Sequence, residues 1–90
     1  MENRVAPKLR LLYDKEGDIL HISAVPAYAD QDSDFIGDDV YARMNPDTGA
    51  VESIEILGFS QHFNKLGDTF ELPVVAELSL ANDNVFDHVE

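Results

Sequence analysis

Three aspartates at alternate positions are the first residues of this chain whose types and spacing could do chemistry. Asp30, Asp32 and Asp34 match the first three ligand positions of a calcium-binding loop, in which oxygens hold the cation. Such a loop also needs glycine at its sixth position and glutamate at its twelfth, where this chain has Phe35 and Tyr41. The match fails at its most demanding positions. The sequence therefore predicts no metal site here and favours a solvated acidic loop.

The histidines and serines are not spaced for zinc binding or for nucleophilic catalysis. His21, His62 and His88 lie far apart and form no HExxH-type helical pair. Ser60 is close to His62 in sequence, but no Gly-x-Ser-x-Gly turn surrounds it. The chain has no cysteine and its five glycines are isolated, so thiolate chemistry and phosphate-binding loops are excluded. We expect no catalytic residue and no cofactor.

One group of side chains keeps a second function class open. Tyr13, Asp14, His21 and Glu55 would serve a small hydrolase or a ligand-binding protein if the fold brought them into a shared cleft. This alternative requires all four side chains to converge on one pocket.

The charge of the chain indicates what kind of partner it can bind. The sequence has 18 acidic and 6 basic residues, a formal net charge of −12, and no lysine or arginine from Glu16 to Ala42. Nucleic acids and anionic membrane surfaces are bound through basic side chains, so both are disfavoured as partners. The sign fits a basic protein partner, or solubility alone. The candidate partner-binding residues are Asp30, Asp32, Asp34, Asp38 and Asp39.

The length of the chain, 90 residues, predicts a single small domain. We place its core at 9–81 and expect 82–90 to be a frayed tail. A domain of this size has a thin stability margin, and an exposed strand edge favours pairing, so we expect a homodimer. The N-terminal residues lack the apolar stretch of a secretory signal and no apolar run is long enough to span a bilayer, which predicts a cytoplasmic protein.

Alternating apolar residues predict the elements that must position these side chains. Four strands are expected, over 9–13, 19–24, 40–44 and 50–57. Residues 25–38 contain a proline and many acids without a period, and are interpreted as a surface loop. The fold class is therefore mainly β, with α+β as the alternative. We expect a small antiparallel sheet of four to five strands, built from two successive hairpins, with at most one short helix.

Turn chemistry supports the two hairpins. The segment 14–18 predicts a loop in which Gly17 takes a positive φ. The segment 45–49 is the clearer turn, because its proline presets φ at the second position and Gly49 supplies a left-handed residue. The apolar alternation slips within the last strand, which predicts a bulge near Glu52 and Ser53.

The C-terminal third admits two interpretations. Every second residue from Phe70 to Leu80 is apolar, which predicts an extended strand with Pro73 at an edge or a bulge. A helix beginning at Pro73 is the alternative. The phenylalanines in or near connectors are expected to cover the core, although some could form a docking patch.

Two segments resemble a known family. YDKEGDILHI at 13–22 and DDVYARMNPDTGAVESIEILGFS at 38–60 are similar to domain-of-unknown-function family 2283, a group of small, mostly bacterial proteins. The match covers about residues 9–60 and departs from the common pattern at His21, where an aromatic residue is frequent. The resemblance implies a compact, mainly β domain and brings no established activity, cofactor or catalytic residue. Some relatives are encoded beside small toxin-like proteins, which implies an antitoxin-like role.

From these observations we expect a protein that acts through contacts with other proteins and not by catalysis. One such protein is an antitoxin-like inhibitor that binds a basic partner through its aspartates.

Overall fold

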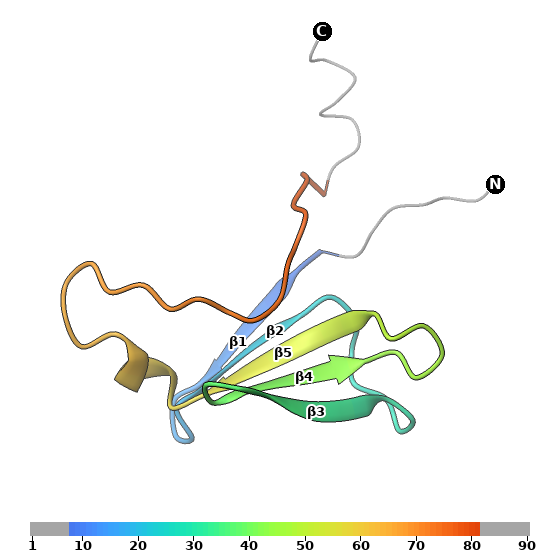
Figure 1. The fold of residues 1–90 in the computed structure, drawn as a ribbon, viewed down its shortest axis with the longest axis horizontal. Helices are drawn as coiled ribbons and strands as arrows, with labels where there is room; N and C mark the ends of the chain where they lie inside the picture. The colour runs from blue at the N-terminus through green and yellow to red at the C-terminus, as the bar shows by residue number, and fades with distance from the viewer. Residues whose placement is uncertain (1–7, 82–90) are drawn as a thin grey trace, which may run out of the picture.

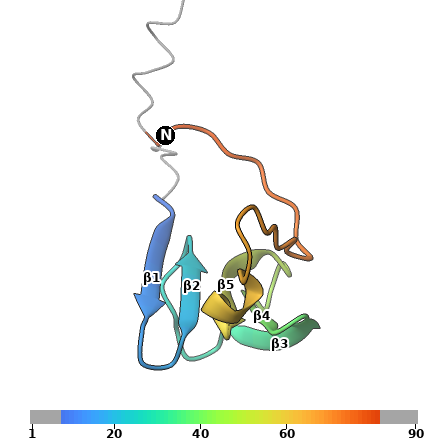
Figure 2. The same ribbon diagram turned by 90° about the vertical axis from the view of Figure 1, so that its left-hand side faces the viewer.

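The computed structural model describes residues 8–81, which form one open antiparallel sheet (Figure 1). Its strands are β1 (Arg10–Asp14), β2 (Ile19–Ser23), β3 (Asp32–Gly37), β4 (Val40–Met44) and β5 (Val51–Leu57), followed by one short 3-10 helix, η1 (Phe59–His62). Their order in the sheet is β1-β2-β5-β4-β3, so β1 and β3 are the two edges (Figure 2). The predicted fold class, mainly β with a single antiparallel sheet, is confirmed. No helix within residues 8–81 is long and apolar enough to cross a bilayer.

The alternation of side chains gives the sheet two different faces. We call the first the apolar face: it carries the four buried residues of the core, Val40, Ala42, Ile54 and Ile56. Leu20 and Ile22 of β2 pair with Ile56 and Ile54 across the sheet and extend this face toward β1. The opposite face, which we call the polar face, carries the intervening residues of the same strands, because successive side chains in a strand point to opposite sides.

The β1–β2 turn differs in one detail from the expectation. The carboxylate of Asp14 accepts a hydrogen bond from the backbone N–H of Gly17 at 3.2 Å, which is the bond that an aspartate at the start of a turn is expected to form. The left-handed residue, however, is Asp18, with φ 57°, and not Gly17. A Cβ atom on Gly17 would lie 2.9 Å from an Asp14 carboxylate oxygen. Glycine therefore suits this position because a side chain would collide with the Asp14 carboxylate, and not because φ is positive.

The turn predicted at 45–49 is confirmed and joins β4 to β5. Asn45 Oδ1 accepts hydrogen bonds from the backbone N–H groups of Asp47 and Thr48, at 2.8 and 3.1 Å. Gly49 has φ 77° and donates its N–H to the carbonyl of Asn45 at 2.8 Å.

The predicted bulge is also present. Arg43 pairs with Ser53 and Met44 pairs with Val51, so Glu52 is the additional residue on β5. The bulge places Val51 and Ile54 on the same side of the sheet although they are three residues apart. This explains the slip in the apolar alternation.

The interpretation of 25–38 as a loop is wrong for its second half. Asp32–Gly37 forms β3, which pairs with β4 and has a register shift between Phe35 and Gly37. Asp32 and Asp34 occupy the positions where apolar residues would reveal a strand, and only Ile36 on that face packs against the core. An edge strand tolerates this composition because one side of it is open to water.

The expectation of a strand over Phe70–Leu80 is wrong, and so is the alternative helix: the segment has neither structure. Its alternation nevertheless has structural meaning, because Phe70, Leu72 and Val74 pack against the core. The segment runs back over the sheet as an extended strap, which we define as residues 70–74 (Figure 1). Pro73 has no N–H to donate to a strand partner, which suits an extended segment lying on a face. The tail at 82–90 lies outside the described residues.

Candidate functional site

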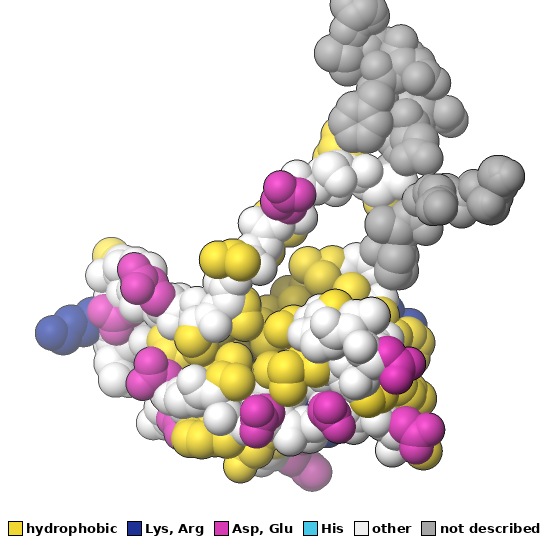
Figure 3. Space-filling model, turned by 45° about the vertical axis from the view of Figure 1, so that its right-hand side comes forward, with side chains coloured by type: hydrophobic (Ala, Val, Ile, Leu, Met, Phe, Trp, Pro, Cys, Tyr) yellow, Lys and Arg dark blue, Asp and Glu magenta, His cyan; other side chains and the backbone are white. Residues whose placement is uncertain are grey.

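The predicted aspartates are distributed along the β3 edge of the sheet. Asp32 and Asp34 are opposite Met44 and Ala42 in the pairing with β4, so they lie at the rim of the apolar face. Asp30 lies in the turn that precedes β3. Figure 3 shows acidic side chains along the border of an apolar surface beside the C-terminal segment. Within residues 8–81, none of these three exposed carboxylates has a hydrogen-bond or salt-bridge partner.

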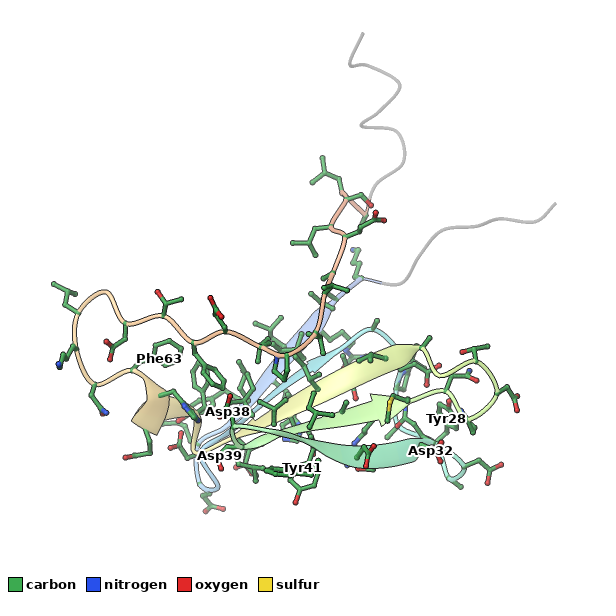
Figure 4. The ribbon with its side chains drawn as sticks, in the orientation of Figure 1. Tyr28, Asp32, Asp38, Asp39, Tyr41 and Phe63 are labelled. Atoms are coloured by element: carbon green, nitrogen blue, oxygen red, sulfur yellow. The ribbon has the colours of Figure 1, made fainter. Side chains whose placement is uncertain are left out.

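Asp38 and Asp39 form the turn between β3 and β4 and do not belong to a strand. Both residues are left-handed, with φ 51° and 66°, and the flanking Gly37 and Val40 are paired. Two left-handed residues between paired strands make a tight hairpin turn of the kind that matches the twist of a sheet. Aspartate accepts this conformation better than most residues. The turn holds the two carboxylates at the end of the same acidic edge (Figure 4).

Asp39 also contacts the helical turn after β5. Its carboxylate lies 3.4 Å from Nε2 of His62, and the His62 ring stacks on Phe70 with 4.1 Å between ring centroids. The separation and orientation do not make a hydrogen bond, and His62 Nε2 is buried without another partner in the described part of the chain. The contact joins the β3–β4 turn to the start of the strap.

Exposed aromatic side chains border the acidic edge. Phe35 of β3 and Tyr41 of β4 are directly opposite each other on the polar face, with 5.1 Å between ring centroids. Phe35 is 57 % exposed and Tyr41 37 %. Tyr28, before β3, is 39 % exposed. These rings and the carboxylates of Asp32 and Asp34 lie on opposite faces of the same edge, and each of the two groups attracts lysine and arginine side chains.

Glu52, the bulged residue of β5, holds the segment that leads into β3. Its carboxylate accepts hydrogen bonds from the Tyr28 hydroxyl at 2.6 Å, the Gln31 amide at 3.0 Å and the Asn45 amide at 3.1 Å. The bonds from Tyr28 and Gln31, with a further one from Asn45, lower the pKa of Glu52. The bond to Glu52, together with desolvation and nearby negative charge, raises the pKa of Tyr28 to about 12. The bulge thus fixes where β3 begins.

The four residues of the alternative site do not converge. Tyr13 lies on the apolar-face side of β1, donates its hydroxyl to Asp18 at 2.5 Å and packs edge-on against Phe59. Asp14 is engaged in the β1–β2 turn. Only His21 and Glu55 come together, because they are paired on adjacent strands of the polar face. The shared cleft that the alternative required is not formed by all four.

Asp18 connects the first hairpin to η1. Besides the Tyr13 hydroxyl, its carboxylate accepts the backbone N–H of Ser60 at 3.0 Å and the Ser60 hydroxyl at 2.8 Å. These bonds, that from Tyr13 first, lower the pKa of Asp18. The same bond to Asp18 is the main cause that raises the pKa of Tyr13. The serine near His62 is therefore tied to an aspartate of the β1–β2 turn and not to the histidine.

A cluster on the polar face was not predicted as a whole. Glu55 Oε2 lies 3.2 Å from His21 Nδ1 and accepts hydrogen bonds from Arg43 Nε and Nη2 at 3.2 and 3.1 Å. Ser23 and Ser53 lie on the same face. A carboxylate on His21 Nδ1 would orient the ring as a base, but no hydrogen bond in the described residues joins either serine to it. The geometry therefore supports binding better than nucleophilic catalysis.

Metal coordination has no site among residues 8–81, because no three histidine or acidic side chains gather there.

Tyr28, Tyr41 and Arg43 are the functional candidates that sequence reasoning missed. The alternation along the strand predicts that Tyr41 and Arg43 lie on the side opposite Val40 and Ala42, but it does not predict that they lie beside β3 and Glu55.

No protein-family model, curated protein or solved structure matches this chain.

Proposed function

We propose that this protein is a non-enzymatic protein-interaction module that binds a basic protein segment along the edge of β3. The observation that carries the proposal is one open strand edge that combines carboxylates without partners among residues 8–81 with exposed aromatic rings. The carboxylates are those of Asp30, Asp32, Asp34 and Asp38, and the rings are those of Tyr28, Phe35 and Tyr41.

Strand addition is the mode of binding that this edge supports. β3 is the last strand of the sheet, so the backbone groups on its outer side have no strand partner within residues 8–81. A segment of the partner can pair with them and extend the sheet. Its side chains would then stand about 5 Å from those of β3. Lysine or arginine on one side of that segment would meet Asp32 and Asp34, and side chains on its other side would meet Phe35.

The acids also select against the wrong partner. Two copies of β3 side by side would bring aspartates against aspartates, and inward-pointing charges on an edge strand oppose such pairing. The other edge, β1, is different, because Leu11 and Leu12 are exposed there, on opposite faces. We accordingly propose that a homodimer forms through β1 and leaves β3 for the basic partner. Sedimentation equilibrium at tens of micromolar should show a 20 kDa species, whereas a 10 kDa species alone would refute the dimer.

An antitoxin-like protein that neutralises a basic toxin is one case of this function. Its support is the charge of the chain, together with the resemblance to family 2283 that we infer from the motifs at 13–22 and 38–60. A cytoplasmic location belongs to the same proposal.

The proposal is tested with a synthetic ten-residue peptide of alternating lysine and valine, and with its glutamine counterpart. Titration of the ¹⁵N-labelled protein should shift the amide signals of β3 with the lysine peptide only, and the affinity should fall steeply with salt. Changing Asp32 and Asp34 together to Asn should abolish most of the binding. Glu71 and Glu77, both exposed, provide the matched control when changed together to Gln.

Equal losses of affinity for the lysine peptide in the two double variants would mean that net charge, and not the β3 edge, attracts the peptide. Shifts confined to another element, or no binding by the lysine peptide, would refute the proposed site.

A further inference from the structure

The polar face contains a hollow that is lined by arginine and serine side chains and plays no part in the proposed function. Four residues form a continuous row across four strands: Arg10 pairs with Ser23, Ser23 with Ser53, and Ser53 with Arg43. Neighbouring strands are about 4.8 Å apart, so two small serines separate two long arginines. All four line one cavity of about 470 Å³. The short serine side chains leave the space, and the arginines stand at its two ends.

The charge of this hollow is opposite to that of the protein. Residues 8–81 contain two arginines, and both line it, in a chain with a net charge of −12. The only acidic residue in its lining is Glu55. At physiological ionic strength charges are screened beyond about 8 Å, so a ligand in the hollow responds mainly to these local groups.

Glu55 offsets part of the positive charge of this hollow and orients the guanidinium of Arg43. Its carboxylate is held on one oxygen by His21 and by two N–H groups of Arg43. A guanidinium has five N–H donors, and no other acceptor within the described residues takes those that Arg43 has left. Fixing the guanidinium in advance lowers the entropy lost when a ligand binds.

The remaining lining determines what else the ligand carries. Leu12 on one side and Val25, Pro26 and Ala27 on another present apolar surface next to the serine hydroxyls. The volume lies within the range of small-molecule sites, which are mostly apolar with a few polar groups that fix orientation. A compact ligand with one anionic group and an apolar body satisfies both parts of the lining.

We propose that this hollow binds a small organic carboxylate, with its anionic group over Ser23 and Ser53 within reach of Arg10 and Arg43, and its apolar body against Leu12 and Pro26. The planar carboxylate matches the paired N–H groups of a guanidinium. The site is separate from the β3 edge and does not depend on binding of a basic partner there. Its lining includes Leu12 of β1, so it lies beside the edge through which we propose that the dimer forms.

The test uses four probes of similar size: benzoate, phenyl phosphate, benzyl alcohol and benzylammonium. Titration of the ¹⁵N-labelled protein with benzoate should shift the amides of Ser23, Ser53 and Arg43, with saturation. Benzyl alcohol and benzylammonium should bind at least about tenfold more weakly, because the charged hydrogen bonds are lost. Tighter binding of benzoate than of phenyl phosphate would support a carboxylate as the ligand, and the reverse order would overturn that choice of anionic group.

Variants separate the arginines from the overall charge. Arg10→Gln and Arg43→Gln should each weaken benzoate about tenfold. Lys65→Gln removes the same charge from an exposed loop and should leave the affinity within about twofold, since it touches nothing in the hollow. Ser53→Val fills the floor without changing charge and should weaken binding as strongly as loss of an arginine.

Dispersed amide spectra before titration show that each variant is folded. Benzoate affinities that are equal in Arg10→Gln and Lys65→Gln would overturn the proposal. Saturable shifts on β3, or shifts of the same size with benzyl alcohol, would do so as well.

Discussion

The strap makes a prediction in which two adjacent residues of the same type should behave differently. Val74 packs against the core, whereas Val75 is 98 % exposed. Val→Ala removes two methyl-sized groups, each contributing about 0.8 kcal/mol when fully buried. Half burial at Val74 gives a loss of about 0.8 kcal/mol for Val74→Ala. The loss for Val75→Ala should be close to zero, since the removed methyl groups are in water in both states.

The measurement is urea unfolding followed by far-ultraviolet circular dichroism, because the chain has no tryptophan. The midpoint should fall for Val74→Ala at an unchanged slope, and the melting temperature should fall by about 3–6 °C. Val75→Ala is the matched control, because both substitutions change backbone propensity equally. Equal midpoints for the two variants would show that the strap does not cover the sheet as described.

Four further predictions concern a turn, two titrating side chains and the net charge. Gly49→Val should cost about 1–2 kcal/mol because φ is positive there, while exposed Glu16→Gln should cost under about 0.5 kcal/mol; equal unfolding midpoints would refute the turn. Because the pKa of Tyr28 is raised in the folded state, its contribution to stability is complete below pH 10 and is lost as pH rises toward 12, and Tyr28→Phe should flatten that part of the stability profile. The pKa of Glu52 is lowered, so its contribution is present above the ordinary glutamate pKa and is lost as pH falls below it; Glu52→Gln should remove this acid dependence, and an unchanged profile would contradict the hydrogen bonds. Raising sodium chloride from low ionic strength to a few tenths molar should raise the melting temperature by screening the excess negative charge, and an indifferent melting temperature would show that the charges are too dispersed to matter.

The elements that were predictable from the sequence are those whose signals are local. The segment 45–49 contains its own hydrogen bonds and its left-handed glycine, so the turn is visible without the rest of the fold. The apolar alternation of β2, β4 and β5 reports that each buries one face. The slip within β5 reports the bulge at Glu52 for the same reason.

β3 escaped prediction because its burial pattern is set by its place at the edge. Asp32 and Asp34 lie on the side that carries apolar residues in the inner strands, where water still reaches them. Its turn uses Asp38 and Asp39 in conformations for which glycine or asparagine is the usual signal. The strap shows the converse case: its alternation is local, but whether it pairs in the sheet or lies across it depends on tertiary packing.

The hollow on the polar face could not have been found from the sequence, because its four residues come from four strands. Their alignment depends on the strand order β1-β2-β5-β4 and on the register of each strand pair; the bulge at Glu52 lies just beyond the row, between the pairs Arg43–Ser53 and Met44–Val51. The residues of a site can thus be identified by type while the register that joins them is a property of the whole sheet.

β4 lies between the two proposed sites, since Tyr41 borders the acidic edge and Arg43 lines the hollow. If the sites are independent, changing Asp32 and Asp34 to Asn weakens the lysine peptide and leaves benzoate unchanged, and Arg10→Gln does the opposite. If they are coupled, benzoate changes the affinity for the peptide, and the peptide must then change the affinity for benzoate by the same factor. Ser33 of β3 pairs with Arg43, which gives such coupling a direct physical route. Measuring each affinity in the presence of the other ligand decides between the two cases: unchanged affinities show independent sites, and an equal change in both affinities shows coupling.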